Sequence, residues 1–137
     1  MSSGVTVSQE CQDAFQQLKL GKKTKFIIFK ISDDYKEFVV EKTSESAEYD
    51  EFLNSFPELS PRFGVYDFEY EIPGEGKRNK ICFISWAPDE SKIKDKMIYA
   101  SSREALRRAV VGIGAEIQGT DFDEVSYDQV LQKVLRK

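Results

Sequence analysis

The chain has 137 residues, which is enough for one domain with a real core but too few for two independent domains. It contains 24 acidic and 20 basic residues, a formal net charge of −4, and no histidine. The missing imidazole removes the usual general base and the commonest transition-metal ligand, and no phosphate-binding loop motif occurs, so we expect no enzyme, cofactor or metal site.

The composition, with 40% hydrophobic and 32% charged residues, is typical of a soluble globular protein. No apolar run reaches the length of a membrane span, and the first residues lack the pattern of a secretory signal, which predicts a cytosolic protein. Cys11 and Cys82 match no metal-binding or redox spacing. We therefore expect two buried free thiols.

The first half of the chain predicts a helix, a hairpin and a second helix. Ser8 is the expected cap of a helix over 8–21, whose apolar positions share one face: Cys11, Ala14, Phe15 and Leu18. The nearly continuous apolar run 25–31 is typical of a strand covered on both faces, and a Ser-Asp-Asp turn leads to a second strand over 35–42. Aromatic residues at helical spacing within 46–57 predict a short second helix.

The second half predicts another hairpin. Aromatic and acidic residues alternate over 63–72, which predicts one buried face and one acidic face that includes Asp67. A Pro-Gly-Glu-Gly turn then leads to an apolar strand over 80–86, and residues 116–118 are a candidate short strand.

Two helices complete the predicted elements, one over 92–111 and one from Ser126, where Ser126 and Gln129 have capping-box spacing. One-sided helices before and after apolar hairpins predict an α/β or α+β fold, with a central mixed sheet sandwiched between helices. We expect a single domain over 1–137, with a flexible N-terminal segment over 1–6.

The helix over 92–111 concentrates positive charge in an acidic protein. At about 100° per residue, Tyr99 and Leu106 lie on the core face, and Met97 lies opposite with Lys94 and Arg108 nearby. A solvated charged face with one exposed apolar residue explains this pattern, and so does a groove-binding surface for an acidic partner. The residues alone leave both explanations open.

Two smaller basic groups lie elsewhere, one at a hairpin tip and one on the last helix. Their members are Lys77, Arg78 and Lys80 at the tip, and Lys133, Arg136 and Lys137 on the helix. Taken separately, they are explained by a soluble turn and by favourable cations at a helix C-terminus.

Four segments together carry a family resemblance: LGKKTKFIIF, YDFEYEI, GKRNKICFISWAPD and KMIYASSREALRRA. In this order they resemble the ADF/cofilin family of actin-binding proteins over essentially the whole chain. The resemblance implies an ADF-homology fold and a monomeric protein that binds actin monomers and filament sides, prefers the ADP state, and severs and depolymerises filaments. It implies the cytoplasm and the actin cytoskeleton as location, with the nucleus as a second one, and no nucleic-acid partner.

Carried onto matching positions, the resemblance implies two actin-binding surfaces. The surface for monomers and filaments comprises Ser3, Gly4, Val5, Lys94, Lys96, Met97, Arg107 and Arg108. The filament-specific surface comprises Lys77, Arg78, Lys80, Lys133 and Arg136. Ser3 matches a phosphorylation switch of the family, with Ser2 as its neighbour, and a phosphate there would weaken binding to an acidic partner.

Phosphoinositide headgroups are implied as competitors for the same basic residues. Two departures accompany the resemblance: the lack of histidine predicts weak pH sensitivity, and Gln132 stands where relatives can carry an acid. The alternatives are a related module acting on another cytoskeletal complex and a peripheral phosphoinositide-binding protein, against which the net charge of −4 weighs.

Overall fold

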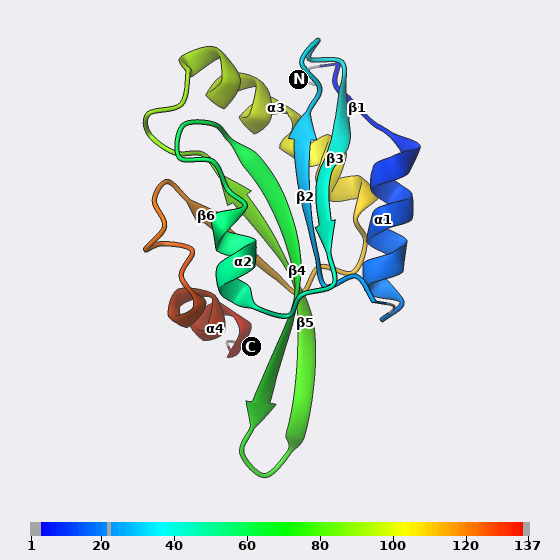
Figure 1. Cartoon of the computed structure of the whole chain (residues 1–137), viewed down its shortest axis with the longest axis vertical. Coiled ribbons are helices and arrows are strands. Elements are labelled where there is room, and N and C mark those ends of the chain that lie inside the picture. The colour runs from blue at the N-terminus through cyan, green and yellow to red at the C-terminus, as the bar shows by residue number, and fades with distance from the viewer. Residues whose placement is uncertain (1–3, 22, 136–137) are drawn as a thin grey trace.

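The computed structural model describes residues 4–21 and 23–135 (Figure 1). The elements in chain order are β1 (Thr6–Val7), α1 (Gln9–Lys19), β2 (Phe26–Ile31), β3 (Glu37–Ser44), α2 (Tyr49–Asn54), β4 (Arg62–Ile72), β5 (Gly76–Trp86), α3 (Ile93–Ala109), β6 (Ala115–Gly119) and α4 (Tyr127–Leu135). No helix in these described ranges is long and apolar enough to cross a membrane.

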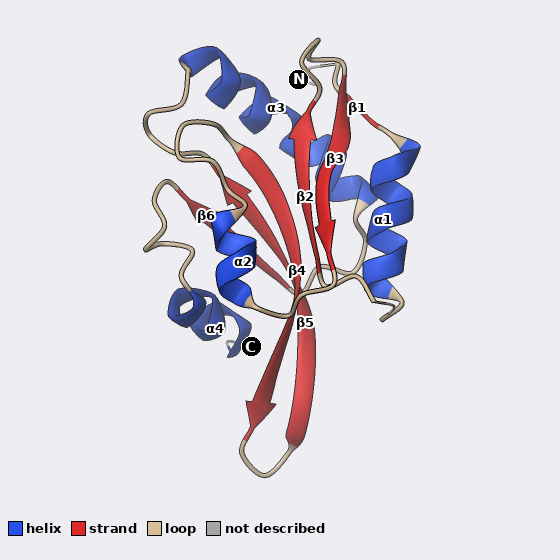
Figure 2. Cartoon of the chain, viewed as in Figure 1, coloured by secondary structure: helices blue, strands red, loops and turns tan. Residues whose placement is uncertain are grey.

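The strands form one mixed sheet in the order β1-β3-β2-β4-β5-β6. β1 runs parallel to β3 and β6 runs parallel to β5, while the other neighbouring pairs are antiparallel. Helices cover both faces of the sheet (Figure 2), so the predicted α+β sandwich is confirmed. The candidate strand at 116–118 is confirmed as part of β6.

Side chains from alternate positions of β2 enter two separate cores. Ile27 and Phe29 pack with buried residues of α1 and α3, whereas Phe26 and Ile28 pack with buried residues of α2 and α4. Each such side chain contributes about 1.5–3 kcal/mol when it is fully buried. The continuous apolar run of this strand therefore follows from its position between two layers of helices.

The β4–β5 hairpin is longer than the body of the sheet. It pairs without interruption from Arg62 opposite Trp86 to Ile72 opposite Gly76, and its far end projects beyond the helices (Figure 1). Gly74 and Gly76 have φ values of 81° and 87°, which the absence of a Cβ makes accessible in the connecting turn. The hairpin thus carries exposed backbone and side chains away from both cores.

The expected exposure of Asp67 is wrong. This residue is only 8% exposed, and Asn79 donates a hydrogen bond of 3.0 Å to its carboxylate. The first half of β4 is buried on both faces, and the predicted exposure of acids begins only at Glu69. The alternation of apolar and acidic residues therefore describes the projecting half of the hairpin but not the half inside the sheet.

The expectation for the N-terminal segment also differs from the structure. Val5 is 4% exposed in the core beneath α1 and α3, and Thr6 and Val7 pair with Glu37 and Phe38. The expected flexible segment 1–6 is therefore too long, because the fold includes at least Val5 and Thr6. A two-residue strand has no detectable periodicity, so sequence pattern could not predict it. Residues 1–3 lie outside the described part of the chain.

The helix caps agree with prediction in part. Ser126 Oγ accepts a hydrogen bond from the Gln129 amide at 3.4 Å, which is half of the predicted capping box. Ser8 occupies the position before α1, but its side chain makes no capping hydrogen bond and instead contacts Cys11 Sγ at 3.4 Å. The predicted side-chain cap at Ser8 is therefore wrong, although the helix begins where expected.

Cys11 and Cys82 are both free and buried, as predicted. Burial raises the pKa of Cys82 to about 12 and also raises the pKa of Cys11. Both groups therefore stay protonated at neutral pH and pack as small apolar side chains.

Gly64 in β4 provides a test of the core that contains α2. A Cβ at this position would lie 2.7 Å from Phe56 Cζ and 2.8 Å from Phe52 Cζ. We expect Gly64→Ala to lower the free energy of unfolding by about 1–3 kcal/mol, because the aromatic rings must move. Urea denaturation measures the change. The Gly64→Ala/Phe52→Leu double variant should lose less than the sum of the single variants, and simple additivity would contradict the close contact.

Candidate functional site

The outer side of α3 presents apolar and basic groups together. Ile93 is 75% exposed and Met97 is 67% exposed, and Lys94 is exposed between them. The exposed positions of this stripe, called here the α3 surface, are Ile93, Lys94, Met97, Ala100, Ser101, Glu104 and Arg108. The predicted exposure of the methionine amid positive charge is thus confirmed.

The inner side of α3 fixes the helix to the sheet. Tyr99, Ser102 and Leu106 are buried there, and the Ile31 amide donates a hydrogen bond of 2.9 Å to the Tyr99 hydroxyl. The predicted core face is correct for Tyr99 and Leu106, whereas the burial of Ser102 was not predicted. Because one side is anchored in the core, the α3 surface is held on a rigid support.

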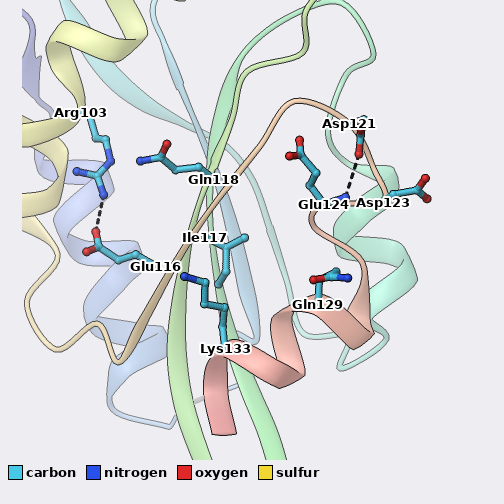
Figure 3. A pocket seen from close by; sticks show the side chains of 9 residues that line it. All are labelled: Arg103, Glu116, Ile117, Gln118, Asp121, Asp123, Glu124, Gln129 and Lys133. Atoms are coloured by element: carbon cyan, nitrogen blue, oxygen red, sulfur yellow. Dashed lines mark hydrogen bonds and ion pairs between the residues drawn. The ribbon is translucent and has the colours of Figure 1, made fainter. Parts of the chain in front are cut away.

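Two of the predicted site cations on α3 are bonded within the protein. Lys96 Nζ donates to the Asp89 carbonyl at 2.6 Å, and Arg107 Nε donates to Glu116 Oε1 at 2.7 Å. Arg103 reaches the same carboxylate oxygen at 2.6 Å (Figure 3). Arg108 is exposed and lies on the α3 surface, so the structure separates it from Arg107.

Glu116 links β6 to α3 through both arginines. Partial burial alone would raise its pKa, but the hydrogen bonds and charges of Arg107 and Arg103 outweigh this effect and hold the pKa below its usual value. The ionised carboxylate is therefore the favoured form at neutral pH. This connection fixes the C-terminal half of α3 against the sheet edge.

The N-terminal segment lies beside α3, because β1 contacts that helix. Gly4 is exposed, whereas Val5 is buried, so Val5 does not offer its side chain to a partner. The described strand that follows the predicted N-terminal contacts is thus a neighbour of α3. Ser3, the predicted phosphorylation site, lies outside the described residues together with Ser2.

The second group of predicted site residues lies on the projecting hairpin and on α4. Lys77, Arg78 and Lys133 are exposed, and Arg78 approaches Glu75 at 3.9 Å. Lys80 is half-buried, and its Nζ donates to the Val134 carbonyl at 2.7 Å, which ties β5 to the end of α4. Arg136 falls outside the described residues.

The hairpin tip and the N-terminal end of α3 lie at opposite ends of the long axis of the molecule (Figure 1). The α3 surface therefore begins at one end of the molecule, and the basic tip of the hairpin lies at the other. They share the sheet as a common support, because β4 and β5 pass through the body before they form the projecting hairpin.

A hollow of about 700 Å³ lies between β6, the loop that follows it and α4 (Figure 3). Two of its acids serve the local structure: Glu124 accepts hydrogen bonds from the Thr120 amide and hydroxyl at 2.7 Å, and Asp121 accepts one from the Glu124 amide at 2.9 Å. Among the described residues no group of three or more acids or cysteines is placed to hold a metal ion.

Comparisons with known proteins agree with this architecture. The family described as cofilin/tropomyosin-type actin-binding protein matches residues 4–135. A cofilin of Mycosarcoma maydis is 62% identical over 136 residues, covering 99% of this chain and 98% of the relative. A cofilin of Schizosaccharomyces pombe is 56% identical, covering 98% of each chain.

Solved structures show the same fold. The crystal structure of Streptomyces griseoflavus cofilin superposes with a TM-score of 0.92 at 55% identity, covering 97% of this chain and 98% of the other. Plasmodium berghei actin depolymerization factor 2 superposes with a TM-score of 0.88 at 31% identity, covering 99% and 100% of the two chains. The chain therefore belongs to the cofilin/ADF family of actin-binding proteins.

The connection between Glu116 and its two arginines generates a pH-dependent prediction. The folded pKa is depressed, so the stabilisation is present above the ordinary Glu pKa and is lost as the pH falls below it. We expect Glu116→Gln to lower the free energy of unfolding by about 1 kcal/mol at pH 7, since the ion pairs are partly exposed, and by less at pH 3.

Urea denaturation at the two pH values measures the difference. Glu104→Gln is the matched control, because Glu104 is exposed and makes one looser contact of 3.6 Å with Arg103. The control should change stability by less than about 0.5 kcal/mol at either pH. An effect of Glu116→Gln that is the same at both pH values would contradict the ionic role.

Proposed function

We propose that this chain binds actin monomers and the sides of actin filaments, prefers ADP-bound subunits, severs filaments and accelerates their depolymerisation. The observation that carries the proposal is the α3 surface, where exposed Ile93 and Met97 adjoin exposed Lys94 on a helix anchored in the core. An adaptable methionine beside an exposed cation suits an apolar groove on an acidic partner such as actin. The protein acts by binding and needs no catalytic group.

The monomer-binding surface combines the N-terminal segment with α3. Exposure supports direct contacts by Gly4, Lys94, Met97 and Arg108. The burial of Val5 and the internal bonds of Lys96 and Arg107 support an indirect role, in which they fix the backbone and the helix beneath the contacts. The surface proposed for actin is therefore narrower than the set of matched family positions.

The filament-specific surface comprises the exposed Lys77, Arg78 and Lys133, with Lys80 as a structural tie between β5 and α4. A protein bound to the side of a filament must contact two neighbouring subunits at once. Basic surfaces at opposite ends of the molecule suit this geometry, and Arg136 belongs to the same proposed surface by family resemblance.

Severing follows from differential affinity in this mechanism. A protein that binds one filament twist more tightly than another shifts the population of filaments toward the preferred twist, because its free energy of binding differs between the two twists. Strain then concentrates at boundaries between bound and bare stretches. Filaments break at these boundaries without hydrolysis of any bond by the protein.

Regulation at Ser3 is part of the proposal. A phosphate there would add negative charge to the N-terminal segment and oppose an acidic partner. Phosphoinositides would compete for the same cations. We propose that the protein acts as a monomer in the cytoplasm and nucleus, with little pH sensitivity of its own because it has no histidine.

The α3 surface is tested by Met97→Ala combined with Arg108→Ala. We expect affinity for ADP-actin monomers and for filaments to fall about tenfold or more, because an apolar anchor and a charge from the same face of α3 are both lost. Fluorescence titration of labelled monomers and microscopy of filament lengths measure the two effects. Wild type should fragment filaments, and the variant should not.

Leu20→Ala combined with Lys23→Ala is the matched control, since Leu20 is 65% exposed and Lys23 is exposed in the connection between α1 and β2. This pair should bind and sever as wild type does. Filaments that remain intact with wild type would refute the proposed severing, and equal losses in both double variants would refute the assignment to α3.

The projecting hairpin is tested by Lys77→Ala combined with Arg78→Ala. Filament binding should weaken about tenfold, whereas monomer binding should change by less than about twofold, because only the filament offers a second subunit. Co-sedimentation and monomer titration measure the two affinities. Glu69→Gln combined with Glu71→Gln, on the paired strand β4, is the control for changes in the structure of the hairpin. Equal loss of binding to monomers and filaments in the Lys77/Arg78 variant would contradict a divided interface.

A further inference from the structure

Tyr35, in the connection between β2 and β3, has an unusual backbone conformation. Its φ is 60°, and it is the sole residue other than glycine with positive φ within residues 4–21 and 23–135. An aromatic residue is disfavoured in this left-handed region, where Asn and Gly are accommodated more readily. A conformation of this kind persists only when its surroundings determine it.

The surrounding turn is closed by several hydrogen bonds. The Tyr35 amide donates to the Ser32 carbonyl at 2.8 Å, and the Ser32 amide donates to the Glu37 carbonyl at 2.7 Å. Asp34 accepts from the Ser32 hydroxyl at 2.6 Å and from the Lys36 amide at 3.1 Å. The turn therefore holds the Tyr35 side chain in a fixed direction.

That direction is toward the first turn of α3. The Tyr35 hydroxyl donates to Asp95 Oδ1 at 2.8 Å, and Lys94 Nζ lies 4.6 Å from the centre of the Tyr35 ring. One side chain thus contacts two consecutive residues of α3. The hydrogen bond to Asp95 is also the main cause of a raised Tyr35 pKa.

We propose that Tyr35 is a positioning residue for actin binding, which holds Lys94 in its binding orientation and restrains Asp95 away from the partner. The inference rests on the proposed function, because it assigns Lys94 to the actin contact. The hydrogen bond between Tyr35 and Asp95 joins residues that lie 60 positions apart in the sequence.

The ring acts on Lys94 by reducing its freedom. A free lysine side chain loses rotational freedom about several bonds when it is immobilised in an interface, and this loss of entropy opposes binding. A cation held over an aromatic ring has lost part of that freedom before the partner arrives, while its exposed ammonium keeps donors for a carboxylate. The expected result is tighter binding without any contact between Tyr35 and actin.

The Tyr35 hydroxyl holds the Asp95 carboxylate by a hydrogen bond, and the negative charge of that carboxylate would oppose an acidic partner. Asp95 is half-buried and lies next to Lys94 in α3, where its carboxylate would repel an acidic partner if it turned outward. The bond to Tyr35 draws the carboxylate toward a polar hollow of about 180 Å³ that Arg62 also lines. Both contacts therefore favour the same partner.

Two substitutions separate these effects. Tyr35→Asn removes ring and hydroxyl while tolerating positive φ, and Tyr35→Phe keeps the ring. We expect Tyr35→Asn to weaken binding to ADP-actin monomers about two- to fivefold, and Tyr35→Phe to weaken it less than about twofold. The urea midpoint should change little for Tyr35→Asn, since relief of backbone strain offsets the lost packing of the ring against the core and the lost hydrogen bond.

The link to Lys94 is tested by a double-mutant cycle and by NMR. Lys94→Ala should cost at least about twofold less in the Tyr35→Asn background than in wild type. The ε-methylene protons of Lys94 should show an upfield ring-current shift in wild type and Tyr35→Phe that disappears in Tyr35→Asn. A purely structural role would not move this signal selectively.

The outcomes distinguish this inference from the proposed function. If Lys94→Ala weakens binding but Tyr35→Asn does not, or if the two changes are additive, the positioning role is refuted while the actin surface stands. If Lys94→Ala and the Met97/Arg108 double variant both bind actin as wild type does, the proposed surface is refuted and the role of Tyr35 falls with it.

Discussion

The fold depends on burial of both faces of one sheet. β2 has apolar side chains on both sides, and neither set can leave water unless a separate helix layer covers it. α1 and α3 cover one face, whereas α2 and α4 cover the other. The α3 surface is the outer side of a helix that covers the sheet, and the projecting hairpin extends from two strands of the sheet. The need to bury both faces of the sheet therefore fixes the position of both.

The division into two layers also explains how the candidate site is supported. α3 commits Tyr99 and Leu106 to one core and leaves Ile93 and Met97 outside. The projecting hairpin derives its direction from the same sheet, because the strands that form it continue from the buried body without a break in register. The two basic surfaces are therefore parts of one rigid frame, although they come from distant segments of the sequence.

Periodicity and apolar runs predict the elements that bury large side chains. The run at 25–31 and the stripe of α3 are such cases, because their patterns are the direct result of contact with the core. The burial of Asp67 and the pairing of Thr6 depend on which strand lies alongside, and that information is absent from the local pattern.

The same limit applies to the site. The exposure of Met97 follows from helix geometry, so sequence reasoning finds it. The bond between Arg107 and Glu116 joins α3 to β6, and the contact between Tyr35 and Asp95 joins a turn to a distant helix. Helix geometry places Arg108 near Met97 and away from Arg107, but only the folded chain shows that Glu116 lies where Arg107 can bond to it.

The two cysteines occupy different sides of the sheet, Cys11 in the core under α1 and α3 and Cys82 in the core under α2 and α4. A hydrogen-bonded sheet separates them, so the native chain has no route to an internal disulfide. Oxidants and alkylating reagents can reach either sulfur only after the corresponding helix layer has opened. Each thiol is thus a built-in reporter of one face, and the order in which the two are modified records which layer of the protein loosens first.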